Sequence, residues 1–166
     1  MVSLLTGWPG KPSHPPLTDA SIGAYTVGVA MLVAGKLSLQ TPQMAVGAEI
    51  AISGGLLLAL PTALTGLLDW LGIEKGTPYR TVATIHLFTM LTATVLFALT
   101  WLAQRPGYNH AEIQTLGLVL GLIAEGVLAA GGFIGGTLVF VYGVRVLKRA
   151  DEPVATALIP GRSEPE

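Results

Sequence analysis

The sequence contains no cysteine, and only 11% of its 166 residues are charged. The absence of cysteine excludes disulfides, iron–sulfur clusters and thiolate metal ligands within the chain. Soluble domains carry about 25% charged residues, so this low charge is typical of a membrane protein. The net charge is −1 and basic residues do not cluster away from the helix ends, which argues against nucleic acid as a partner. The first residues lack an apolar core of about 7–15 residues, so we expect no cleaved signal peptide.

The sequence is instead dominated by four long apolar runs joined by short connections, which predict a single domain. We place the runs at residues 17–38, 44–71, 79–103 and 114–144. A hydrocarbon core of about 30 Å requires about 20 helical residues, so each run is long enough to cross it. The predicted fold is an all-α bundle of transmembrane helices over residues 17–149, in antiparallel, up-and-down order.

Polar, proline-rich segments flank this domain. Residues 1–16 contain four prolines (Pro9, Pro12, Pro15 and Pro16) and are predicted to form an irregular arm on the membrane surface. Residues 150–166 are predicted to be disordered. Of the nine Lys and Arg residues, Lys36 and Arg105 fall on one predicted side and the other seven on the side of the termini. This asymmetry predicts that both termini lie in the cytoplasm.

His86 is the only histidine inside an apolar run, and a titratable side chain at membrane depth is a functional-site hypothesis by default. The predicted topology places His14, Asp19 and Asp69 in the same layer, at the cytoplasmic end. Each residue also has a purely structural interpretation. Asp19 suits a helix N-cap, His14 an exposed loop, and His86 a buried hydrogen bond. Asp69 suits the interfacial end of a helix, where its partner would be His14, Arg80 or His86.

Two acidic residues are predicted nearer the outer half of the bundle. We expect Glu49 to reach the interface, and Glu125 to point inward and accept hydrogen bonds from threonines of the third run. Glu125 belongs to a glycine-rich face of the fourth run. Such faces let helices approach closely, so this one is a candidate contact with a membrane complex or a second copy of the chain. Its glycines are Gly117, Gly121, Gly132 and Gly136.

Several motifs in fixed order resemble a known family. They are HPPLTDASIGAYT, ALPTALTGLLDWLGI, a histidine that opens the third run, and GGTLVFVYGVRV. In this order, over residues 11–146, they resemble the bacterial four-helix membrane family catalogued as domain of unknown function 2231. The resemblance implies a multi-pass protein of the bacterial cell (inner) membrane. Some relatives are fused to Rieske-type domains, which suggests electron transfer by analogy.

The chain departs from that family's pattern at three places. Lys11-Pro12 stands where the family often has a second His-Pro, Ser21 where it often has proline, and Tyr142 where it commonly has histidine. If the family binds heme or metal through several histidines, two possible ligands are missing here.

The first function hypothesis is a heme- or metal-binding subunit, because four-helix bundles build cofactor sites from facing helices. For heme b, His86 would be one axial ligand and His14, Met31 or Met90 the other. The usual pair of histidines within the spans is absent. A divalent metal suits the ligand chemistry better, with the ligands His14, Asp19, Asp69 and His86.

The second hypothesis is a non-catalytic accessory subunit that packs against a larger membrane complex through two faces of small residues. One is the glycine-rich face of the fourth run, and the other, on the first run, consists of Ala20, Ala24 and Gly28. An enzyme is less well supported, since we find no nucleophile–base pair, metalloprotease motif or phosphate loop, and we assign no catalytic residue. A transporter is also less well supported, because the two halves of the chain show no inverted repeat.

Overall fold

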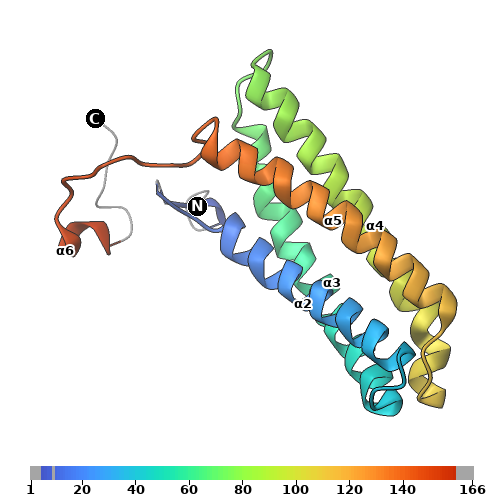
Figure 1. The fold of residues 1–166 in the computed structure, drawn as a ribbon. Coiled ribbons are helices and arrows are strands. Elements are labelled where there is room, and N and C mark those ends of the chain that lie inside the picture. The colour runs from blue at the N-terminus through green and yellow to red at the C-terminus, as the bar shows by residue number, and fades with distance from the viewer. Residues whose placement is uncertain (1–4, 9, 160–166) are drawn as a thin grey trace.

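The computed structural model describes residues 5–8 and 10–159. Within them, four long helices lie side by side along a common direction (Figure 1). All four are long and apolar enough to cross a membrane. The prediction of an all-α protein with four such helices is therefore confirmed. The helices are α2 (His14–Lys36), α3 (Thr41–Leu71), α4 (Pro78–His110) and α5 (Thr115–Phe140).

The start of α2 differs from the prediction, because the helix begins at His14 and not at residue 17. Pro15 and Pro16 occupy its first positions, where the missing backbone N–H groups would have no helical acceptor in any case. The N-cap residue is Ser13, so the expectation of an Asp19 N-cap is wrong. The consequence is that His14 belongs to the helical bundle.

The ends of two other helices also differ from the predicted bounds. The helix α4 continues through Pro106 to His110, beyond the predicted end at 103, and α5 ends at Phe140 and not at 144. A short helix, α6 (Val154–Ala157), lies in the segment that the sequence predicted to be disordered.

The segment before α2 forms a two-stranded hairpin where the sequence predicted an irregular arm. Strand β1 (Gly7–Trp8) pairs antiparallel with β2 (Lys11–Pro12). Gly7 has a φ of 78°, and a Cβ there would lie 2.7 Å from the backbone N of Ser13, so this position requires glycine. The hairpin contacts the segment after α5, since a Cβ on Gly10 would lie 3.0 Å from Leu147. Figure 1 shows both segments at the same end of the bundle.

The helices pack closely through small residues. A Cβ on Gly28 would lie 2.6 Å from Ile52, and one on Gly55 would lie 2.6 Å from the Tyr25 ring. The Tyr25 ring in turn stacks on Phe97 of α4, with ring centroids 3.9 Å apart. Glycine at these contacts lets neighbouring helix backbones approach, which is how helices associate in lipid, where the hydrophobic effect is weak.

The glycine-rich face of α5 is divided in the structure. Gly117 and Gly121 are buried within the bundle, where a Cβ would contact Gln104 or Leu32, so they are not available to a partner. A Cβ on Gly132 would meet no atom within 4 Å, and one on Gly136 only Phe140 at 3.8 Å. These two positions of the predicted face are not filled by neighbouring helices, and both line the cavity described below.

We expect Gly121→Leu to destabilise the isolated protein. A Cβ at this position would lie 3.2 Å from Leu32 and 3.3 Å from Thr100, so the larger side chain would separate α5 from α2 and α4. Overpacking of this kind costs about 1–3 kcal/mol. The measurement is unfolding in mixed detergent micelles, with Gly132→Leu on the same helix as control. Equal free energies of unfolding for the two variants would contradict this packing.

Contrary to the prediction, the side chain of Glu49 does not extend to the membrane interface. Its side chain is 5% exposed, and neither carboxylate oxygen has a hydrogen-bond partner among the described residues. Arg105 of α4 lies 3.9 Å away, through its Nε. Glu125 does point inward, but it accepts its hydrogen bond from Thr26 of α2 at 2.8 Å and not from a threonine of α4.

Candidate cofactor site at two histidines

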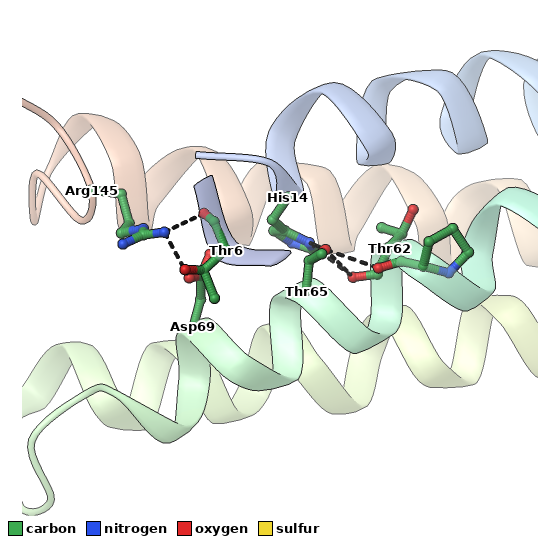
Figure 2. A network of polar contacts seen from close by, with 7 residues as sticks. Thr6, His14, Thr62, Thr65, Asp69 and Arg145 are labelled. Carbon is green, nitrogen blue, oxygen red and sulfur yellow. Dashed lines mark hydrogen bonds and ion pairs between the residues drawn. The ribbon is translucent and has the colours of Figure 1, made fainter. Parts of the chain in front are cut away.

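His14 lies at the start of α2 with its imidazole against α3 (Figure 2). The ring Nδ1 is 3.0 Å from the carbonyl oxygen of Thr62. A carbonyl can only accept, so Nδ1 carries the proton and Nε2 keeps a free lone pair. The nearest hydroxyl to that Nε2 is Thr18 Oγ1 at 3.4 Å, and Thr18 donates its proton to the His14 carbonyl at 2.9 Å. Nε2 of His14 is therefore available as a ligand atom.

His86 on α4 is held in the same way against α5. Its Nδ1 lies 2.9 Å from the carbonyl oxygen of Gly131. By the same reasoning Nδ1 donates, and Nε2 keeps its lone pair. A histidine that donates Nδ1–H to a backbone carbonyl has its tautomer and ring orientation fixed, which is the usual arrangement of histidines that bind metals.

Each of these hydrogen bonds requires a glycine one turn further along the accepting helix. A helical carbonyl points toward the residue four positions later. A ring that binds this carbonyl therefore occupies the space where the Cβ of that residue would lie. A Cβ on Gly66, four residues after Thr62, would lie 2.6 Å from Cε1 of His14. A Cβ on Gly135, four residues after Gly131, would lie 2.9 Å from Cε1 of His86. The two histidines are therefore held in the same way: Nδ1 donates to a backbone carbonyl, and a glycine four residues later leaves space for the ring.

The two imidazoles lie next to each other. Their ring centroids are 6.5 Å apart and their planes are at 85°. The expectation that only one histidine belongs to the membrane helices is therefore wrong, since α2 begins at His14. The helix start places a second imidazole beside His86.

Both histidines line a cavity of about 580 Å³, within the range of about 300–1,000 Å³ typical of cofactor and small-molecule sites. Its walls come from all four helices, the hairpin and the segment after α5, and they are mostly apolar. Met90 also lines it, whereas Met31 does not. The polar side chains that face this space include Tyr25, Asp69, Thr94 and Arg145.

Asp69 forms an ion pair that the sequence did not predict. Its Oδ1 is 3.3 Å from Arg145 Nη2, and the same Nη2 donates to the Thr6 carbonyl (Figure 2). The expected partners of Asp69 did not include Arg145. Arg80, one of those expected, instead lies over the Trp70 ring, 3.6 Å from its centroid, and donates to the Ile73 carbonyl at 3.0 Å. Arg145 ends a long apolar run, but nothing in the run indicates which acid it meets.

The predicted metal ligands do not assemble into a metal site. Among residues 5–8 and 10–159, no three His, Cys, Asp or Glu side chains are placed so that they could hold one ion. Asp19 lines the cavity but is exposed, and Asp69 is engaged by Arg145. His14 and His86 remain as a pair of ligand groups.

These features define a multi-pass membrane protein whose helical bundle encloses a cavity with two oriented histidines. A family model described as a predicted membrane protein, DUF2231, matches residues 10–148. The chain therefore belongs to this family. No curated protein and no solved structure matches it. The matched range includes both histidines, Asp69 and Arg145.

Proposed function

We propose that the protein is a small membrane subunit that binds heme b through His14 and His86 and takes part in electron transfer. The observation that carries the proposal is the histidine pair, with ring centroids 6.5 Å apart and both Nδ1 atoms hydrogen-bonded to backbone carbonyls. The Nε2 atoms are then the available ligand atoms, and histidine is an established axial ligand of heme iron.

The number of ligands favours heme over a divalent ion. A zinc site takes three or four protein ligands, and the described residues bring no such set together. Heme needs only axial ligands from the protein, because the porphyrin supplies the other four nitrogens. The apolar cavity also suits a porphyrin. When bound, heme would supply one-electron redox chemistry.

The chain's own residues would orient this cofactor and shield it from water. Gly66 and Gly135 leave space for the two rings, and the carbonyls of Thr62 and Gly131 fix their tautomers. The hairpin and the segment after α5 also line the cavity. Arg145, which lies in that segment, connects it to the residues before the hairpin by donating to the Thr6 carbonyl. Such cover limits access of water and raises the strength of electrostatic interactions inside.

We further infer an up-and-down arrangement with both termini in the cytoplasm of a bacterium and the bundle in its inner membrane. The start of α2 lies beside the end of α3, because His14 contacts the Thr62 carbonyl, which supports opposite directions for these two helices. The excess of Lys and Arg on the side of the termini supports the orientation. The histidine pair would then lie near the cytoplasmic side.

The second candidate function is a non-catalytic accessory subunit of a larger membrane complex. The side chain of Phe133 on α5 favours it, because it is 82% exposed and lies outside the cavity lining, where another helix could pack against it. This candidate requires no cofactor at the histidines.

The testing experiment is an optical spectrum with metal analysis of the protein purified in mild detergent, before and after addition of heme. We expect a Soret band and about one heme per chain. A protein that stays colourless and metal-free, and that does not bind added heme, would refute the proposal and favour the accessory role.

A further inference from the structure

Arg145 adopts a backbone conformation that is uncommon for a residue with a side chain. Its φ is 62°, in the left-handed region, which is unfavourable for an L-residue. Such residues persist only when their surroundings hold them, and they cluster at ligand-binding sites. Arg145 also lines the cavity that contains His14 and His86.

The guanidinium of Arg145 is held at one nitrogen and left unsatisfied at another. Its Nη2 is engaged by Asp69, at 3.3 Å, and by the Thr6 carbonyl. Its Nε is buried and has no hydrogen-bond partner among the described residues. A buried donor without an acceptor is unfavourable, and more so when the group is charged. The arrangement therefore leaves a charged donor ready for an acceptor.

The position of this donor relative to the histidines indicates which part of a ligand it would meet. Asp69, which pairs with Arg145, lies three residues after Gly66, against which His14 packs. Three helical residues correspond to a rise of about 4.5 Å along α3. The donor thus lies toward the end of the bundle where the hairpin is, beyond the histidine pair. A ligand whose apolar body reaches the histidines would present a side group here.

We propose that Arg145 binds a carboxylate of the ligand in this cavity. Resting on the proposed function, that carboxylate is a propionate of heme. A hydrogen bond from an arginine N–H group to a carboxylate is charge-assisted and about twice as strong as a neutral one, and Nε is the free donor here. Asp69 is a positioning residue in this arrangement, because its ion pair and the Thr6 carbonyl fix the guanidinium while Nε stays free.

The test compares binding of heme with binding of heme dimethyl ester, which keeps the iron and the ring but has no carboxylate. Binding is measured by Soret titration of the full chain in detergent. Because a hydrogen bond between charged groups strengthens binding, we expect the wild type to bind heme roughly tenfold more tightly than it binds the ester. Arg145→Leu should lower heme affinity to that of the ester and leave ester binding unchanged. Lys148→Leu removes the same charge three residues later, outside the cavity lining, and should keep the preference.

Equal binding of heme and ester by the wild type would overturn the role of Arg145 and leave histidine ligation intact. Binding of neither compound would overturn both proposals. A preference for heme that survives in Arg145→Leu would also overturn this role. If that variant fails to fold, Arg145→Lys keeps the positive charge without the guanidinium. The wild-type comparison decides the proposal without any variant.

Discussion

His86→Ala and His14→Ala should each abolish tight heme binding in the purified protein. Each substitution removes one of the two nitrogens that would hold the iron and leaves the other imidazole in place, because the two rings are hydrogen-bonded to different helices, α3 and α5. Loss of an outer-shell hydrogen bond already lowers metal affinity about 10–100-fold, and loss of the ligand itself should exceed this. The measurement is a Soret titration, with about 100-fold or greater loss of affinity expected for either variant.

The control for these substitutions is His110→Ala. His110 is the last residue of α4, it is exposed, and it does not line the cavity. Its loss should leave the spectrum and the affinity unchanged. Full heme binding in both His14→Ala and His86→Ala would show that the pair does not ligate iron. An equal loss in His110→Ala would indicate binding elsewhere on the protein.

Gly135→Leu should reduce heme binding almost as strongly, although Gly135 contributes no side chain. A Cβ at this position would lie 2.9 Å from Cε1 of His86, so a leucine must displace the imidazole from its hydrogen bond with the Gly131 carbonyl. A misplaced ligand ring loses both its orientation and its tautomer control. We expect about 10–100-fold weaker binding in the same titration.

Gly126 on the same helix supplies a matched control. A Cβ on Gly126 would meet no atom within 4 Å, and Gly126 does not line the cavity, so Gly126→Leu adds the same side chain to α5 without contact to His86 or to the proposed binding space. It should bind heme like the wild type. Similar weakening in both variants would mean that the loss arises from general damage to α5, and the argument that glycine admits the histidine ring would then fail.

The number and class of the helices could be predicted from sequence alone. Apolar runs of about 20 residues have one stable arrangement in lipid, because only helices satisfy their own backbone hydrogen bonds there. The choice of His86 as a candidate site residue has a related reason, since a polar ring inside such a run is costly unless it has a partner. These inferences need only the local composition of the chain.

The boundary of the first helix shows where local reasoning reached its limit. Four prolines favoured an irregular arm, yet Pro15 and Pro16 fit the first helical positions, and His14 becomes part of the bundle. Proline is compatible with both states, so the packing of α2 against α3 decides between them. The burial of Glu49 depends in the same way on neighbouring helices, which the apolar pattern of its own run does not specify.

The sequence by itself determined a four-helix membrane protein with a functional-site candidate at His86, because lipid solvation acts on each run separately. The tertiary structure decided which groups meet. His14 contacts a carbonyl 48 residues away, His86 one 45 residues away, and Arg145 pairs with Asp69. Such contacts depend on the rotation and depth of each helix relative to its neighbours. Those are set by glycine contacts between helices, which no single segment of the sequence contains.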